Sequence, residues 1–210
     1  MSHDTWTHRI VRPIIRPLIG TAVTPNHLTA VRLLTGAGAA LLLAGGDPFW
    51  SDVAAGLFVL SFLLDRADGE LARQSGRASP GGHRFDLYAD YAANIMVFVG
   101  MGMGMQGGPL GRLAVALGAV AGAAVGAVFW VVNRVGRLEG KAEFASAKGF
   151  DPDDAMIVIP LAVWLGAEAY VLCAAAIGAP LFLAWTIWRF RRSLGSAHQS
   201  MRESIVPRNR

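Results

Sequence analysis

Long apolar stretches separated by short polar links occupy most of the chain. A helix that crosses a membrane needs about 20 mostly apolar residues. Six segments approach that length: Leu28–Gly45, Ser51–Leu71, Asp86–Gln106, Leu110–Val132, Asp154–Gly166 and Tyr170–Phe190. The fifth is short, and a break at residues 166–168 separates it from the sixth. The pattern predicts an all-α integral membrane protein with six transmembrane helices in a single domain, residues 1–210.

A basic segment precedes the first apolar stretch. Arg9, Arg12 and Arg16 recur at spacings of three and four, with apolar residues between them. Such spacing predicts an amphipathic helix on the membrane surface, which Pro13 and Pro17 shorten or kink. An ordinary basic flank that sets the topology explains the same residues, so both interpretations stay open.

The basic residues outside the apolar segments fall on one side of the membrane. Gly46–Trp50, Gln106–Leu110 and Gly166–Ala169 contain no Lys or Arg, whereas the alternate links and both ends carry nearly all of them. The positive-inside rule therefore places both termini in the cytoplasm. We expect residues 1–20 to be a juxtamembrane segment and residues 193–210 a cytoplasmic tail, in a protein of the inner (cytoplasmic) membrane.

Composition agrees with this class and excludes others. The chain is 53% hydrophobic and 16% charged, against about 25% charged residues in an average soluble domain. Disorder requires the opposite balance. The single Cys173 excludes an intrachain disulfide and a Cys-based zinc site. The net charge of +4 reflects topology, so we expect no nucleic-acid partner.

Carboxylates interrupt the apolar pattern at one membrane boundary. Asp65 and Asp68 are three residues apart near the end of the second predicted span, and Asp86 and Asp90 are four apart at the start of the third. Each pair therefore shares one face of its helix. The short link at residues 74–81 makes the two helices antiparallel, which lets the four carboxylates converge. Ionisable groups in spans are costly and usually functional.

Four carboxylates in a poorly solvated site cannot all stay ionised without cations. Oxygen ligands favour hard divalent ions, and Mg²⁺ commonly pairs with substrate phosphate. The charge count fits two ions, the arrangement used for displacement at phosphorus. Gly69 and Ala72 leave room for a flat ligand, and Arg73 can bind phosphate. The alternative is a set of interhelical salt bridges to the nearby arginines, Arg66, Arg73, Arg77 and Arg84.

The acids belong to a motif of eight fixed positions, Asp65-x2-Asp68-Gly69-x2-Ala72-Arg73-x8-Gly82-x3-Asp86-x3-Asp90. It resembles the complete signature of the CDP-alcohol phosphatidyltransferases. An upstream stretch is similar to the start of that family's first span, and it reads Thr24-Pro25-Asn26-His27-Leu28-Thr29-x2-Arg32. The layout of spans extends the resemblance from roughly Pro13 to Phe190, and it is closest to small members that resemble phosphatidylinositol phosphate synthases.

The resemblance implies a role for each motif position. Asp65, Asp68 and Asp86 are expected to hold two divalent ions, Mg²⁺ or Mn²⁺. Asp90 is expected to complete the metal site and to act as the base that deprotonates the acceptor alcohol. The residues expected to bind the CDP part of the donor are Asn26, His27, Leu28, Thr29, Gly69, Ala72, Arg73, Ser79 and Gly82. Gly82 is expected to serve this site by permitting tight helix packing.

The same resemblance implies the reaction and the partners. The acceptor hydroxyl attacks the β-phosphorus of a CDP-linked donor, and CMP leaves. CDP-diacylglycerol is the preferred donor because the site lies at the membrane boundary, although another CDP-alcohol with a lipid acceptor uses the same residues. Members usually work as homodimers. The glycine stripes Gly100, Gly104, Gly108 and Gly118, Gly122, Gly126 serve packing within or between subunits.

The link after the fourth predicted span is a candidate acceptor site. Arg134, Arg137 and Lys148 can bind a phosphorylated polyol, and the positive-inside rule explains them too. Relatives that use inositol phosphate have an Arg-rich stretch at the start of the fifth span, where this chain has the acids of residues 151–154. These acids better suit a neutral or cationic alcohol, or they cap a helix.

Two other functions compete with the enzyme. A cation or proton transporter could use the intramembrane carboxylates as ion sites, but it predicts charges near the bilayer midplane and broken helices in paired positions. The acids instead fall at one membrane edge, and no internal repeat is evident. A non-catalytic membrane scaffold leaves the complete motif unexplained.

Overall fold

The structure, a computed structural model, describes residues 6–139 and 152–205. Every regular element in these two ranges is helical, which confirms the predicted all-α class. In chain order the elements are α1 (Trp6–Ile15), η1 (Arg16–Leu18), α2 (Pro25–Ala44), α3 (Pro48–Gln74), α4 (Pro80–Gly104), η2 (Met105–Gly107), α5 (Arg112–Glu139), η3 (Pro152–Ile157), α6 (Val158–Trp164) and α7 (Glu168–Ile205).

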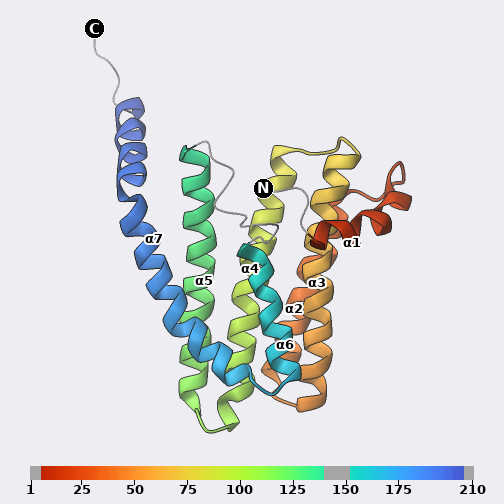
Figure 1. Cartoon of the computed structure of the whole chain (residues 1–210), viewed down its shortest axis with the longest axis vertical. Coiled ribbons are helices and arrows are strands. Elements are labelled where there is room, and N and C mark those ends of the chain that lie inside the picture. Colours follow the sequence, from red (N-terminus) through yellow and green to blue (C-terminus); the bar gives the residue numbers. More distant parts are fainter. Residues whose placement is uncertain (1–5, 140–151, 206–210) are drawn as a thin grey trace.

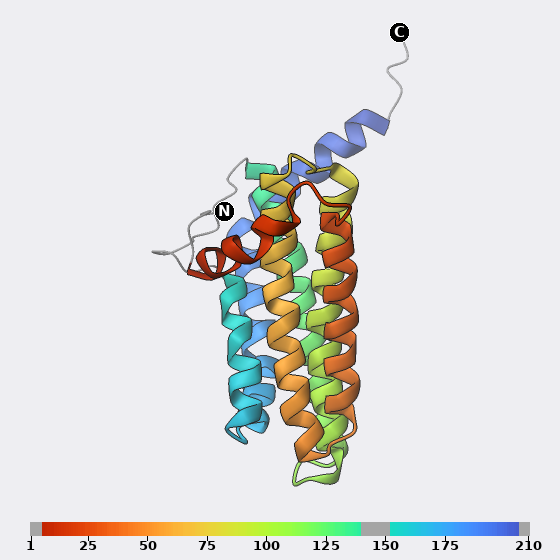
Figure 2. The same cartoon turned by 90° about the vertical axis from the view of Figure 1, so that its right-hand side faces the viewer.

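The helices form one elongated bundle. Helices α2 to α7 run up and down in turn along its long axis, so the C-terminal end of α7 lies at the end where α3 passes into α4 (Figure 1). Helix α1 runs across the bundle near this same end instead of along it (Figure 2). The break predicted at residues 166–168 is present, because α6 ends at Trp164 and Gly166 has a φ of 63°.

Within the described residues, four helical segments are long and apolar enough to cross a membrane: Pro25–Ala44, Pro48–Gln74, Arg112–Gly136 and Glu168–Arg191. The predicted number of six spans is not confirmed. Helix α4 carries the polar Asp90 and Asn94 within its apolar part, and α6 has only seven residues. The helices also continue beyond the predicted apolar segments. Helix α7 extends to Ile205 and so includes much of the predicted tail.

Helix α2 packs against both α3 and α4, whereas α3 and α4 make few direct contacts with each other. Small side chains permit this arrangement. A Cβ on Gly36 of α2 would lie 2.9 Å from the Cβ of Ala93 and 3.2 Å from Oγ of Ser61. Ser61 of α3 donates a hydrogen bond of 3.0 Å to the carbonyl oxygen of Arg32. The side chains of α2 therefore lie between the two helices that carry the motif acids.

Five of the six glycines in the two stripes pack helices within the chain, whereas Gly108 follows η2 and lies outside α4. A Cβ on Gly100 or Gly104 of α4 would overlap backbone carbonyls of α2, those of Ala40 and Leu43. Gly118 of α5 similarly approaches the backbone of α4. Of the two roles predicted for the stripes, the structure therefore shows packing within a subunit.

Candidate active site

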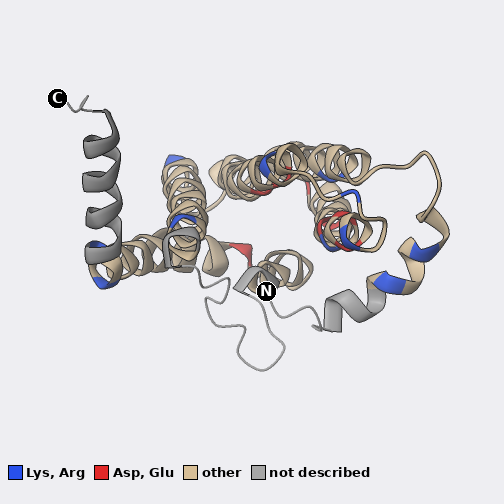
Figure 3. Cartoon of the chain, turned by 90° about the horizontal axis from the view of Figure 1, so that it is seen from above, with Lys and Arg blue, Asp and Glu red and all other residues tan. Residues whose placement is uncertain are grey.

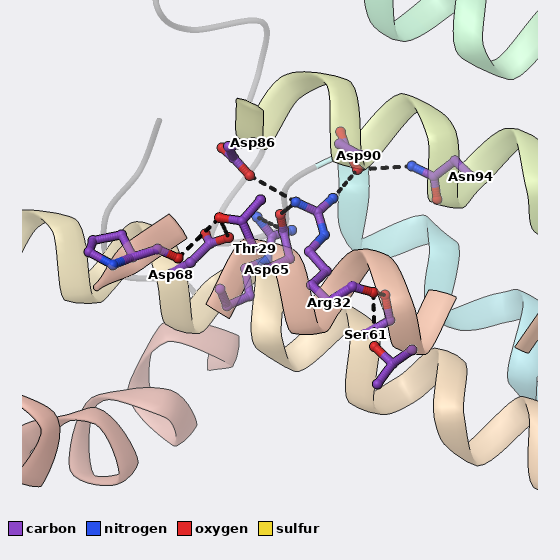
Figure 4. Close-up of polar contacts among 11 residues, drawn as sticks. Thr29, Arg32, Ser61, Asp65, Asp68, Asp86, Asp90 and Asn94 are labelled. Carbon is purple, nitrogen blue, oxygen red and sulfur yellow. Dashed lines mark hydrogen bonds and ion pairs between the residues drawn. The ribbon is translucent and has the colours of Figure 1, made fainter. Parts of the chain in front are cut away.

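Three of the four predicted aspartates converge at the end of the bundle where α3 passes into α4. Asp65, Asp68 and Asp86 each offer one carboxylate oxygen, and these oxygens lie within 4.8 Å of one another. Asp68 is buried, and the other two are partly exposed. Figure 4 shows that the three side chains come from α3 and α4 and point toward a common region. The convergence predicted from the motif spacing is present for these three residues.

Arg32 of α2 lies among the acids. Its Nη1 is 2.7 Å from Oδ1 of Asp65 and 2.8 Å from Oδ1 of Asp86, and its Nη2 is 2.7 Å from Oδ1 of Asp90 (Figure 4). The Arg32 side chain is only 3% exposed. One guanidinium thus bridges three carboxylates from two helices. Arg32 belongs to the upstream motif, and no contact with the acids was predicted for it.

The four arginines named in the alternative to a metal site, interhelical salt bridges, make other contacts. Arg66 approaches Asp65 only at 3.8 Å and its guanidinium lies over the ring of Phe62. Arg73 pairs with Glu70, and Arg77 donates to the carbonyl oxygens of Thr21 and Val23. Within the described residues, Arg84 forms no ion pair. The guanidinium that bridges α3 and α4 comes instead from Arg32 of α2, which was not among the four arginines of that alternative.

Asp90 lies beside the converging aspartates and has its own partners. Nδ2 of Asn94 donates a hydrogen bond of 3.0 Å to Oδ1 of Asp90, the same oxygen that Arg32 contacts. Asn94 is buried and lies one helical turn after Asp90. The spacing of four residues places Asp90 and Asn94 on one helix face, so the pair could have been predicted from the sequence, but Asn94 was not among the predicted site residues. The two donors restrict the orientation of the Asp90 carboxylate.

A small cavity of about 20 Å³ adjoins Asp90, which is room for about one water molecule. Polar side chains line one part of it and apolar side chains the other. The lining residues are Arg32, Phe58, Ser61, Phe62, Asp65, Asp90, Ala93, Asn94 and Met156.

Thr29 connects α2 to the converging aspartates. Its Oγ1 donates a hydrogen bond of 2.7 Å to Oδ2 of Asp68, and both side chains are buried. The residue was expected to contact the donor, and in the structure it holds one of the three acids. Because Thr29 and Arg32 are three apart on α2, they share one helix face and approach the acids together.

The other residues expected at the donor site surround the starts of α2 and α4. Ser79 caps α4 by accepting a hydrogen bond from the amide of Gly82, and a Cβ on Gly82 would lie 3.0 Å from Oδ1 of Asn26. His27 forms a capping box with Thr24 at the start of α2. Leu28 packs against an apolar cluster that α1 and α3 form together. Asn26, His27 and Ser79 are exposed, so the two helix starts form an open edge.

Gly69, Ala72 and Arg73 lie on α3 past the converging aspartates. A Cβ on Gly69 would be 3.5 Å from Nη1 of Arg73, which is an ordinary contact. Among the residues that the structure describes, no contact therefore requires glycine at this position, which fits a role in leaving space for a ligand. Arg73 is partly exposed, with 36% of its side-chain surface accessible.

The predicted acceptor residues are described only in part. Arg134 lies on α5, near the end that approaches the acids. One residue before it, Nδ2 of Asn133 lies 3.2 Å from the hydroxyl of Tyr91, the neighbour of Asp90. The side chain of Arg137 and the whole of Lys148 lie outside the described residues, as does Asp151.

Comparisons with known proteins match most of the chain to one family. The family model for CDP-alcohol phosphatidyltransferase matches residues 22–188. The phosphatidylinositol phosphate synthase of Streptomyces avermitilis is 30% identical over 177 residues, covering 75% of this chain and 71% of the relative. That of Corynebacterium glutamicum is 38% identical over 82 residues, covering 39% of this chain and 36% of the relative.

A solved structure shares the fold. The crystal structure of Mycobacterium tuberculosis phosphatidylinositol phosphate synthase with CDP-DAG bound has a TM-score of 0.64, with 20% sequence identity. The match covers 86% of this chain and 94% of that one. Since the family model spans most of the chain and includes the whole acidic motif, this protein belongs to the CDP-alcohol phosphatidyltransferase family.

Proposed function

We propose that this enzyme transfers a phosphatidyl group from CDP-diacylglycerol to the hydroxyl of an alcohol and releases CMP, in phospholipid synthesis. The observation that carries the proposal is the convergence of Asp65, Asp68 and Asp86 from two helices, beside Asp90. The donor is supported by the fold neighbour that was solved with CDP-DAG bound. Family membership decides against the transporter and the scaffold.

The converging aspartates fit divalent metal ions. Three carboxylate oxygens within 4.8 Å of one another suit Mg²⁺ or Mn²⁺, which prefer oxygen ligands. We propose two ions, held by Asp65, Asp68 and Asp86, with Asp90 completing the site. Bound ions supply charge that stabilises the phosphates of the donor and the leaving CMP. Arg32 brings one positive charge to four aspartates, which leaves negative charge for the ions to neutralise.

Asp90 is the base in this proposal. It takes the proton of the acceptor hydroxyl while that oxygen forms a bond to the β-phosphorus, and the bond from this phosphorus to CMP breaks. General-base catalysis is typically worth about 10²–10⁴-fold. The hydrogen bonds from Arg32 and Asn94 to Oδ1 orient the carboxylate for this proton transfer.

The open edge formed by the starts of α2 and α4 and by Gly69, Ala72 and Arg73 of α3 suits the donor. A lipid nucleotide needs a site where its polar part stays outside the bilayer and its acyl chains stay inside. We propose that this edge lies at the cytoplasmic face, that α1 lies on the membrane surface, and that α4 and α6 complete six crossings. The enzyme is proposed to act as a homodimer.

The acceptor is an alcohol that enters beside Asp90. Both named relatives are phosphatidylinositol phosphate synthases, so inositol phosphate is the first alcohol to test. Arg134 at the end of α5 suits a phosphate on this alcohol. The acids at residues 151–154 favour a neutral or cationic alcohol instead. A panel containing both kinds distinguishes the two.

The test is CMP release from CDP-diacylglycerol by the purified protein, with Mg²⁺ or Mn²⁺, across that panel of alcohols. Wild type is expected to release CMP with one class of alcohol, and Asp90→Asn to lose about 10²–10⁴-fold in rate. Asp52→Asn is the matched control, because Asp52 is an exposed aspartate at the other end of α3. A wild type without CMP release, or an Asp90→Asn variant as active as Asp52→Asn, contradicts the proposal.

A further inference from the structure

Glu70 is a buried carboxylate next to the converging aspartates but turned to different partners. It occupies one of the positions that the motif leaves open, between Gly69 and Leu71 on α3. Its side chain is only 6% exposed. A buried carboxylate is strongly unfavourable unless hydrogen bonds and positive charges compensate it. The partners of Glu70 therefore show why this residue is tolerated here.

Three side chains donate hydrogen bonds to Glu70. Nε and Nη2 of Arg73 lie 3.2 Å and 2.6 Å from Oε2. Nε2 of Gln74 lies 2.7 Å from Oε1, and Nε of Arg12 lies 3.1 Å from the same oxygen. Glu70 is thus the common acceptor for two arginines and one glutamine from two helices.

The contact with Arg73 fixes a guanidinium. Arg73 uses one edge of its planar group, Nε and Nη2, to donate to the same oxygen, Oε2 of Glu70, and this charge-assisted contact holds that edge of the guanidinium against the carboxylate. Its Nη1 lies toward Gly69, 3.5 Å from where a Cβ on that residue would be. Nη1 of Arg73 therefore lies beside Gly69, the glycine proposed to leave space for the donor.

The contact with Arg12 connects this arrangement to α1. Helix α1 packs on α3, where its Val11 and Ile15 are buried against Ala67 and Leu71. Arg12 lies between Val11 and Ile15 in sequence, and its Nε donates a hydrogen bond to Oε1 of Glu70 on α3. In Figure 3, which looks along the bundle, the described part of α1 and η1, with its Arg positions in blue, lies at one side of the bundle. Glu70 is thus joined to α1 by an ion pair as well as by the packing around it.

We propose that Glu70 is a positioning residue that holds Arg73 in the orientation that binds the donor's phosphates, and that Arg12 makes this orientation depend on the docking of α1. The inference rests on the proposed function, in which Arg73 contacts the donor. The affinity for the donor then depends partly on α1, a helix that contains none of the motif residues. Glu70 itself touches neither the donor nor the reacting atoms.

The test is the KM for CDP-diacylglycerol in mixed micelles, measured together with kcat. Glu70→Gln keeps the size of the side chain and removes its charge, so Arg73 loses a charge-assisted contact. The expected result is a KM raised about 10-fold with kcat changed less than about 3-fold, because ground-state and transition-state binding of the phosphates are lost together. Calorimetric binding of CDP to the same variant should weaken by a similar factor.

Variants on α1 separate positioning from surface charge. Arg12→Gln is expected to raise KM about 3-fold, and Arg12→Lys to restore part of the loss. Arg16→Gln is the matched control, because it removes the same charge from the same segment at a position with no ion pair among the described residues; KM should stay unchanged. Glu70→Gln combined with Arg12→Gln should resemble Glu70→Gln alone, since both act through one contact.

Measurements on the Glu70, Arg12 and Arg16 variants distinguish a variant that does not fold from one that folds but binds the donor weakly. Thermal unfolding of each variant shows whether it is folded, and Arg12→Gln tests the inference on a partly exposed side chain if Glu70→Gln unfolds. An active wild type whose Glu70→Gln or Arg12→Gln variant keeps the wild-type KM and CDP affinity overturns the inference alone. Equal effects of Arg12→Gln and Arg16→Gln also overturn it. A wild type that neither binds CDP nor releases CMP overturns the proposed function and the inference with it.

Discussion

Two ionic clusters lie at the same end of the bundle, and their charge balance is opposite. Around Arg32, one guanidinium contacts three carboxylates, those of Asp65, Asp86 and Asp90, and Asp68 lies nearby. Around Glu70, one carboxylate receives two guanidinium groups and one amide. Helix α3 contributes acids to both clusters within six residues, from Asp65 to Glu70.

The difference separates a site that needs ions from one that does not. The Glu70 cluster compensates its buried charge with donors of its own, so it can be rigid in the absence of any ligand. The Arg32 cluster keeps an excess of carboxylates, which favours the uptake of divalent cations. The two clusters should therefore respond differently to the removal of an arginine and to the addition of metal.

The largest expected effect is the loss of Arg32. Arg32→Met should lower the free energy of unfolding by about 3 kcal/mol without metal, the lower end for a broken buried pair, because the carboxylates are partly exposed. Arg12→Met should cost less than about 1 kcal/mol, because Arg12 is 38% exposed and Glu70 keeps Arg73 and Gln74. Denaturant unfolding in detergent with EDTA measures both. Equal losses in the two variants would contradict the proposed difference.

The next effect is stabilisation by metal. At about 100 times its dissociation constant, a ligand that binds only the folded state adds about 2.7 kcal/mol. Mg²⁺ or Mn²⁺ should therefore raise the thermal unfolding temperature of wild type and of Glu70→Gln, but not of Asp68→Asn. Thermal scans of all three proteins with the metal and with EDTA check this. A metal response that survives in Asp68→Asn would place the ions elsewhere.

The smallest effect concerns the partner that holds Asp68. Thr29→Val removes the 2.7 Å hydrogen bond to Asp68. Metal affinity should weaken about 10-fold, as it typically does when a residue that hydrogen-bonds to a metal ligand is lost. Thr35→Val is the matched control, because the Thr35 hydroxyl donates to the carbonyl oxygen of Arg32 on the same helix. Titration with Mn²⁺ followed by electron paramagnetic resonance measures both affinities. Similar affinities for the two variants would remove Thr29 from the site.

Much of the site was predictable because its geometry is local. Asp65 and Asp68 share a helix turn, and so do Asp86 and Asp90, since residues three or four apart always lie on one helix face. The helices themselves follow from long apolar segments whose starts carry capping residues and proline, as at Thr24 and Ser79. The number of membrane crossings did not follow as clearly, because polar residues in α4 and the short α6 weaken the apolar signal.

The all-helical membrane fold and the shared helix faces of the acids could be predicted from the chain, because apolar length and turn periodicity are properties of neighbouring residues; the enzyme class followed from the resemblance of the motif to a family. The packing of α2 against both α3 and α4, which brings Arg32 among Asp65, Asp86 and Asp90, is known from the folded structure alone. The folded structure likewise joins Arg12 to Glu70 across 58 residues of sequence. These pairings depend on which helix faces meet, and side-chain packing over the whole bundle sets those faces.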